Sequence, residues 1–140
     1  MHQDEAIAEG LSRLSRWAIR TSPQQMSMTS LGTLSTLAAG PLRISELAER
    51  EGTAQPGMTA LVNRLAKSGY VIRATDPSDG RATLVHLTAD GERVLAERRA
   101  ARVAALRAHI ETLPPEHRHA LADVLPAIEF LTAGLDKSHD

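Results

Sequence analysis

A polar turn between two strand-forming runs is the feature that most constrains the fold of this 140-residue chain. Residues 76–80 (DPSDG) are turn formers, and each of these residue types favours a turn for its own backbone reason. The flanking runs, 70–73 and 82–87, are rich in Val, Ile, Thr and Leu and predict an antiparallel hairpin with Arg81 beside its tip. Such a small hairpin is marginal in water by itself. We therefore expect it to pack on a larger helical body.

Two short helices are predicted immediately before this hairpin. Ser45 is expected to cap a helix over 46–51 that ends at Gly52. A short link leads to a second helix over 55–68, with Gly69 as its left-handed C-cap. Two helices joined by about three or four residues that include a glycine are typical of a helix-turn-helix. A helix-turn-helix followed by a two-stranded hairpin is a winged helix, in which the hairpin is the wing.

The second of these helices presents two different faces. The apolar side chains expected to face inward are Met58, Leu61, Val62 and Leu65. The small and polar side chains expected to face outward are Gln55, Pro56, Gly57, Thr59, Ala60, Asn63, Arg64 and Lys67. A DNA major groove admits an α-helix, and there Asn or Gln reads adenine while Arg reads guanine. Small residues early in the helix also let its N-terminus approach phosphate. The outward face is therefore predicted to bind DNA.

The remaining segments are predicted to be helical apart from one short strand. Apolar spacing predicts a helix over 4–20 and a second helix that Thr29 caps and Gly40 ends. Residues 42–44 are expected to add a small strand to the hairpin. The fold class is therefore mainly α.

Two more helices are predicted after the hairpin. Thr88 is expected to cap a long helix over 89–112, which Pro114 breaks. The last helix is expected over 115–135, with a kink at Pro126 because proline lacks a backbone donor.

Apolar stripes on the first and last helices exceed what one small domain can cover. Their residues are Ile7, Leu11, Leu14, Leu121, Ile128 and Leu131. We therefore predict a homodimer with a large, apolar helical interface. Residues 1–140 are expected to form one domain, with 29–88 as its winged helix-turn-helix and 4–20 with 89–135 as its dimerisation part.

The composition argues against several classes of function. The chain has no cysteine, which removes disulfides and thiolate metal sites. No apolar run approaches the roughly 20 residues that cross a bilayer, and the polar start is not a secretory signal, so we expect a cytoplasmic protein without a membrane partner. His117 and His119 point to different faces of a helix, so no metal or other cofactor is expected. Ser, His and Asp occur without a catalytic motif, so an enzyme is not expected.

The distribution of charge permits DNA binding without requiring it. The formal net charge of -1 does not indicate a nucleic-acid binder. Residues 54–75, however, contain no Asp or Glu and carry Arg64, Lys67 and Arg73. A segment without acids can also arise by chance.

Three segments, in this order, resemble the MarR family of bacterial transcriptional regulators: LRISELAEREG, MTALVNRLAKSGYVIR and DPSDGRATLVHLTADG. The resemblance covers nearly the whole chain. It implies a dimer whose subunits each meet one half of a palindromic operator in double-stranded DNA. It also implies regulation, most often repression, that is relieved when a small and often phenolic anion binds between the dimerisation and DNA-binding parts.

The resemblance also assigns individual residues to the DNA. The matching recognition-helix positions are Gln55, Gly57, Thr59, Ala60, Asn63 and Arg64. In the wing, Arg81 is expected to enter the minor groove and Asp79 to brace it. Arg73 and Gly80 complete the wing residues that we assign to DNA. Relatives commonly carry arginine at position 60 and often a basic residue at position 80, so Ala60 and Gly80 predict weaker binding or fewer bases read.

Trp17, Met26 and Met28 are predicted to line an effector pocket. The tryptophan offers ring stacking in a chain with few aromatic residues, and methionines make an adaptable apolar lining. Packing in the core or the dimer interface is the favoured interpretation for Trp17, because aromatic side chains at helical spacing usually belong to the core.

Two alternative functions remain open from the sequence. The first is a winged-helix protein-interaction module with weakened DNA binding, which Ala60, Gly80 and the near-neutral charge would explain. The second is a DNA-binding regulator that has no small-molecule effector. A gel shift tests the first alternative, and ligand-induced thermal stabilisation tests the second.

Overall fold

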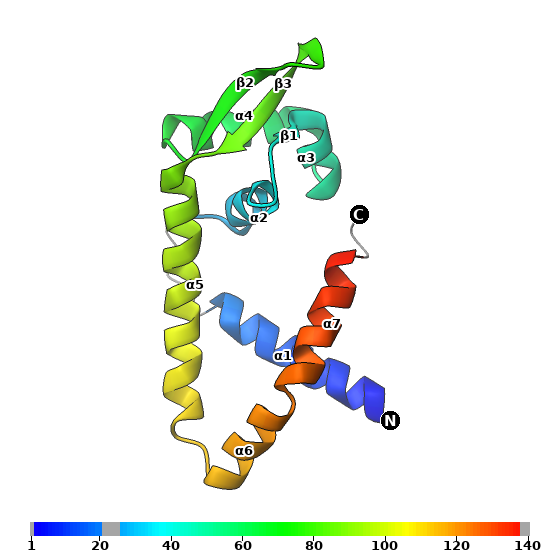
Figure 1. Cartoon of the computed structure of the whole chain (residues 1–140), viewed down its shortest axis with the longest axis vertical. Helices are drawn as coiled ribbons and strands as arrows, with labels where there is room; N and C mark the ends of the chain where they lie inside the picture. Colours follow the sequence, from blue (N-terminus) through cyan, green and yellow to red (C-terminus); the bar gives the residue numbers. More distant parts are fainter. Residues whose placement is uncertain (1, 21–25, 138–140) are drawn as a thin grey trace. The chain divides into compact units, whose positions relative to one another are not determined.

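The protein is described by a computed structural model that covers residues 2–20 and 26–137 (Figure 1). In chain order its elements are α1 (Gln3–Arg20), α2 (Met28–Leu37), β1 (Leu42–Arg43), α3 (Ile44–Arg50), α4 (Gln55–Lys67), β2 (Val71–Asp76), β3 (Asp79–Leu87), α5 (Ala89–Ile110), α6 (Pro115–Asp123) and α7 (Leu125–Lys137). The chain divides into two compact units. We call residues 26–100 the winged-helix unit, and residues 2–20 with 101–137 the terminal-helix unit.

The winged-helix unit contains the hydrophobic core. Its buried apolar residues are Leu34, Leu37, Ile44, Leu47, Ala48, Met58, Leu61, Val62, Leu65, Val71 and Val85. They come from α2, α3, α4 and the sheet, so one core joins both helices of the helix-turn-helix to the wing. The predicted inward face of α4 is confirmed, because its four apolar residues are all buried. Each large buried side chain contributes roughly 1.5–3 kcal/mol relative to exposure.

The sheet has three antiparallel strands in the order β1-β3-β2. The small strand predicted at 42–44 is confirmed as β1 for Leu42 and Arg43, and Leu42 pairs with Val85, whereas Ile44 begins α3. The mainly α winged helix-turn-helix predicted from the sequence is therefore the observed fold. In Figure 1 the hairpin of β2 and β3 extends past the helices of its own unit and ends in a free tip.

The turn predicted over 76–80 is wrong in its extent. Asp76 pairs with Asp79, so only residues 77–78 form the turn, and the strands continue almost to the tip. The next pair is Thr75 with Thr83, which leaves residues 80–82 as a bulge in β3. The strands lengthen because a bulge accommodates extra residues without ending the pairing. Arg81 therefore lies in this bulge, next to the tip.

The predicted cap of α2 is also wrong. The helix begins at Met28, and its N-cap is Ser27, whose Oγ accepts a hydrogen bond from the backbone N–H of Ser30 at 3.2 Å. Thr29 lies inside the first turn, where its carbonyl accepts a hydrogen bond from Thr33. Ser27 and Thr29 lie two residues apart and have similar capping strength, which explains the error.

The predicted start of α3 is wrong for a related reason. The helix begins at Ile44, before the expected range of 46–51, so Ser45 lies inside it. The N-cap is Arg43, whose backbone N–H donates to Oε1 of Glu46 at 3.1 Å. A glutamate at the third helical position that accepts the backbone N–H of the N-cap residue satisfies one free donor at the helix start, so the helix begins at Ile44 without a serine cap.

Thr88 joins the end of α4 to the start of α5. Its hydroxyl donates to the carbonyl of Gly69 at 2.6 Å and accepts the backbone N–H of Gly91 at 3.1 Å, so its predicted role as a cap is confirmed. Gly69 has φ of 83°, the left-handed conformation predicted for it. Gly91 is buried, and a Cβ there would lie 2.4 Å from the carbonyl oxygen of Tyr70. These contacts fix the wing strands between the two helices.

The last helix is not a single kinked helix over 115–135 as predicted. It is broken at Val124 into α6 and α7. In a continuous helix Pro126 would have to donate to the carbonyl of Ala122, and proline has no N–H to do so. The helix restarts instead, with the carbonyl of Val124 accepting the N–H of Ile128 at 3.0 Å.

The terminal-helix unit has no buried core within one chain. None of its side chains whose burial is described is buried. Its exposed large apolar residues are Ile7, Leu14, Val103, Ile110, Leu113, Leu121, Val124, Leu125, Ile128, Phe130, Leu131 and Leu135. Within the described residues, no helix combines the length and apolar character that spanning a membrane requires.

Candidate nucleic-acid interface

The outward face of α4 carries the predicted recognition residues. The exposed ones are Gln55, Pro56, Gly57, Ala60, Asn63, Arg64 and Lys67, and Thr59 is half-buried. They face solvent because the opposite side of the helix supplies four residues to the core. Pro56 lies in the first turn, where a backbone N–H would have no partner inside the helix. The N-cap residue Ala54 makes no side-chain capping bond, so the backbone N–H groups at the start of the helix are open to an approaching anion.

Asn63 and Arg73 contact each other across α4 and β2. The guanidinium Nη1 of Arg73 donates a hydrogen bond to Oδ1 of Asn63, and both residues are exposed. The sequence predicted each residue separately as a DNA contact and gave no sign of the pair. Their separation of ten residues spans the end of a helix and the start of a strand, so no helical spacing signals it.

The wing tip presents Arg81 to solvent. Its backbone N–H donates to Oδ1 of Asp79 at 3.0 Å. The brace predicted from Asp79 is thus made to the backbone of Arg81, and no ion pair joins their side chains in this part of the chain. Gly80, between them, is exposed, and a Cβ there would meet no neighbouring atom within 4 Å.

Asp76 anchors the wing and was missed by the sequence prediction. It is only 6% exposed, and its Oδ2 lies 2.7 Å from Nη2 of Arg43. Its Oδ1 accepts hydrogen bonds from the backbone N–H and the hydroxyl of Ser78, at 2.9 and 2.8 Å. These bonds, together with the Arg43 guanidinium, hold the pKa of Asp76 below its ordinary value. An Asp two residues before a polar turn residue is a recognisable signal, since Asp often bonds the backbone two residues on.

Positive charge on α4 and the wing is largely available to an external partner. Within residues 2–20 and 26–137, no ion pair involves Arg64, Lys67 or Arg81. Of the acidic side chains on the hairpin, Asp76 is paired with Arg43, whereas Asp79 keeps its charge and accepts the backbone N–H of Arg81. A surface with uncompensated cations attracts polyanions despite a near-zero net charge.

The residues predicted for an effector pocket belong to different units. Trp17, in the terminal-helix unit, packs edge-to-face on His109 with ring centroids 5.1 Å apart. Met26 packs against the core of the winged-helix unit, and Met28 is exposed. No group of three or more His, Asp or Glu suited to a metal ion occurs in the described part of the chain.

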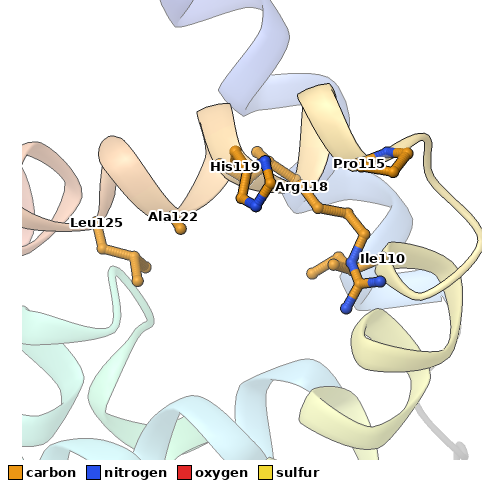
Figure 2. A pocket seen from close by; sticks show the side chains of 7 residues that line it. Ile110, Pro115, Arg118, His119, Ala122 and Leu125 are labelled. Atoms are coloured by element: carbon orange, nitrogen blue, oxygen red, sulfur yellow. The ribbon is translucent and has the colours of Figure 1, made fainter.

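A groove of about 530 Å³ lies within the terminal-helix unit (Figure 2). Its lining residues are Ile110, Pro115, Arg118, His119, Leu121, Ala122 and Leu125. The walls are mainly apolar, with Arg118 and His119 as the polar side chains. It contains none of the residues predicted for the effector pocket, although Leu121 was predicted for the dimer interface.

Comparison with known proteins adds an independent observation. A model of a family described as the MarR family matches residues 24–82. A helix-turn-helix-type transcriptional regulator of Mycobacterium bovis is 35% identical over 144 residues, covering 99% of each chain. A transcriptional regulator of Thermotoga maritima has the same fold, with a TM-score of 0.83 and 22% identity over 95% of this chain and 98% of that one. The multiple antibiotic resistance repressor MarR has a TM-score of 0.70 and 20% identity, covering 96% of this chain and 95% of that one. These proteins are named as regulators of transcription and not as enzymes. This agrees with the expectation from the sequence that the chain is not an enzyme.

Proposed function

Because the chain belongs to the MarR family of DNA-binding transcriptional regulators, we propose that it is a dimeric repressor of a palindromic operator. We further propose that a small ligand releases it, and a phenolic anion is the class to test first. A regulator of bacterial genes acts where the chromosome is, so we place it in the cytoplasm.

The observation that carries the proposal is the exposed polar face of α4 beside a wing with an uncompensated arginine. An α-helix of this kind fits the major groove, where side chains reach base edges. An arginine on a narrow hairpin suits the minor groove, whose potential becomes more negative as it narrows. Arg81, on the wing, and Asn63 and Arg64, on the helix, supply these two kinds of contact.

The proposed contacts divide between helix and wing. On α4 they are Gln55, Pro56, Gly57, Thr59, Ala60, Asn63, Arg64 and Lys67, and on the hairpin they are Arg73, Asp79, Gly80 and Arg81. The helix residues at base edges would give sequence preference, whereas phosphate contacts would give affinity without it.

The terminal-helix unit supports the proposal of a dimer. Its described side chains include no buried residue, yet they include exposed apolar residues on α1, α6 and α7. Phe130, for instance, is 85% exposed. An apolar surface of this extent is typical of a protein interface. A second copy of the chain would cover Ile7, Leu11, Leu14, Leu121, Ile128 and Leu131. The resulting interface would be large and apolar, as the interfaces of obligate dimers are.

Selection of bound DNA from a random pool tests the proposal most directly. Two-fold symmetry would place the two α4 helices in successive major grooves, so half-sites should lie about 10 bp apart. We expect the selected sequences to be palindromic and to give a discrete, salt-sensitive complex in a gel shift. If no DNA sequence is selected, the alternative function as a protein-interaction module with weakened DNA binding is favoured. The uncharged Ala60 and Gly80 on the outward face of α4 and in the wing support that alternative.

The release by a ligand requires a separate test. A ligand that binds the native protein raises its melting temperature by mass action. A panel of phenolic acids should therefore include compounds that raise the melting temperature and also dissociate the operator complex. Substitution of Trp17 by Leu should abolish both effects if Trp17, Met26 and Met28 line the site. Operator binding that no compound changes would support a regulator without an effector.

A further inference from the structure

We propose that Arg73 determines which base Asn63 recognises, because it holds the side-chain amide of Asn63 in one orientation. This inference rests on the DNA-binding function proposed above and adds a specificity-determining role for Arg73. It starts from the hydrogen bond between Nη1 of Arg73 and Oδ1 of Asn63.

The chemistry of the two groups fixes the direction of the amide. A guanidinium only donates hydrogen bonds, and in an asparagine side chain only Oδ1 accepts them. The Oδ1 end of Asn63 must therefore face Arg73. Because Asn63 lies on the exposed face of α4 and Arg73 on β2, the contact links the proposed recognition helix to the wing at the protein surface.

This orientation changes what Asn63 offers to a base. A free asparagine reads adenine with both ends of its amide, since Oδ1 accepts from N6 and Nδ2 donates to N7. The bond from Arg73 occupies one of the two lone pairs of Oδ1 and fixes the direction of the amide, so we expect Nδ2, with its two donor hydrogens, to be the end that meets a base. Guanine presents two acceptors, N7 and O6, on its major-groove edge. Adenine offers the same donors only one acceptor, N7, and has the N6 donor where guanine has O6, so Asn63 held by Arg73 favours guanine over adenine.

A phosphate contact by Arg73 makes a different prediction. Phosphate contacts carry no sequence information directly. If Arg73 only grips phosphate, its removal lowers affinity for every operator variant by the same factor. If it acts through Asn63, its removal changes the ratio of affinities for two bases at one position.

A double-mutant cycle separates these roles. The position to vary is the one where Asn63→Ala flattens the base preference. Operators with each of the four bases at this position are titrated with four proteins: the wild type, Asn63→Ala, Arg73→Ala and the double variant. We expect the wild type to favour guanine over adenine by roughly tenfold. Arg73→Ala should shift this ratio toward adenine, and it should change no ratio once Asn63 is alanine.

Three outcomes of the DNA-binding experiments would overturn the inference. If Arg73→Ala leaves the ratio of the affinities for guanine and adenine unchanged, Arg73 contacts phosphate or makes no contact with the DNA. If Asn63→Ala flattens the base preference at no operator position, Asn63 does not read a base. In both cases wild-type binding to a selected operator would leave the proposed function standing. Wild-type protein that selects no DNA would remove the proposed function and this inference together.

The contact itself can be checked without DNA. The side-chain amide hydrogens of Asn63 give nuclear magnetic resonance signals that depend on the bond to Oδ1. Arg73→Ala should shift these signals in the free protein, while Arg64→Ala, on the same exposed face of α4, should leave them in place. Signals that Arg73→Ala does not move would overturn the inference at its first step.

Discussion

The guanidinium of Arg43 and the carboxylate of Asp76, 33 residues apart in the sequence, form an ion pair with an Nη2–Oδ2 distance of 2.7 Å. A second bond, from Nε of Arg43 to the same oxygen, is 2.8 Å long. Arg43 lies at the junction of β1 and α3, whereas Asp76 lies where β2 meets the turn. The pair therefore ties the tip region of the wing to the first helix of the helix-turn-helix, and we expect it to help position Arg81.

Asp76→Asn should weaken operator binding severalfold through this positioning. The substitution removes a negative charge near the proposed interface, so simple electrostatics would strengthen binding to a polyanion. A loose wing has the opposite effect, because Arg81 would no longer be held in place. Titration of operator DNA measures the sign. Glu49→Gln, which removes one negative charge from an exposed residue of α3, is the matched control, and tighter binding by both variants would contradict the positioning role.

The same carboxylate predicts how stability depends on pH. The hydrogen bonds from Ser78 and the bonds from Arg43 lower the pKa of Asp76 in the folded protein, relative to about 3.9 in an unfolded chain. The folded state then binds fewer protons, so the stabilisation is present above pH ~4 and is lost as pH falls through the folded-state pKa. The melting temperature of wild type should exceed that of Asp76→Asn at pH 7, and the gap should close below pH ~4. A gap that stays constant down to pH 3 would argue against the assignment.

Gly91→Ala should destabilise the winged-helix unit. A Cβ at this position would lie 2.4 Å from the carbonyl oxygen of Tyr70 and 2.5 Å from Cδ1 of Leu87. The backbone carbonyl cannot move without disturbing the start of β2, so we expect a cost of about 1–3 kcal/mol. Gly57→Ala, on the exposed face of α4, is the control, because a Cβ there meets nothing within 4 Å. It should be neutral or stabilise the helix by up to roughly 1 kcal/mol. Denaturant unfolding of both variants compares them directly.

Leu131→Glu should convert the proposed dimer to a monomer. Leu131 is exposed on α7 in the single chain, and a dimer would bury the new carboxylate without a partner. An uncompensated buried charge costs roughly 3 kcal/mol or more. This cost corresponds to an increase of about 100-fold in the dissociation constant of the dimer. Ile72→Glu introduces the same charge at an exposed apolar residue of the winged-helix unit and should leave the dimer intact. Sedimentation velocity at micromolar concentration distinguishes the two, and a wild type that sediments as a folded monomer would refute the proposal.

Local patterns in the sequence predicted the parts of the fold that depend on neighbouring residues. The apolar spacing of Met58, Leu61, Val62 and Leu65 gave the buried face of α4, because a helical repeat places them on one side. Thr88 was recognisable as a cap because a threonine immediately before a helical pattern can accept a backbone N–H in the first turn.

The interactions that the sequence did not predict join distant segments or choose between similar candidates. Arg43 and Asp76 meet only because β1 and β2 flank β3, which no local pattern reveals. Ser27 and Thr29 are both good capping residues, and the choice depends on how α2 enters the core. Pro126 was predicted to kink a helix that in fact ends and restarts, since its missing N–H interrupts the hydrogen bonding between the two halves. The DNA-facing residues were predicted from exposed polar character and family resemblance, but the pairing of Asn63 with Arg73 needed the three-dimensional arrangement.

Arg81→Ala should weaken binding to every operator variant by a similar factor. Arg81 lies in the bulge beside the wing tip, exposed and without an ion pair in the described part of the chain, so its contribution to binding should be mainly charge in a narrow minor groove. The slope of log affinity against log salt should fall by roughly one unit for each phosphate that the variant no longer neutralises. Base preferences should persist, apart from a reduced preference for A·T-rich flanks. The measurement is a titration of single-base operator variants at two salt concentrations. Arg99→Ala, which removes an exposed cation from α5, is the control and should change the slope little. Binding that Arg81→Ala leaves untouched would mean that the wing serves only to complete the sheet, and the minor-groove contact would have to be abandoned.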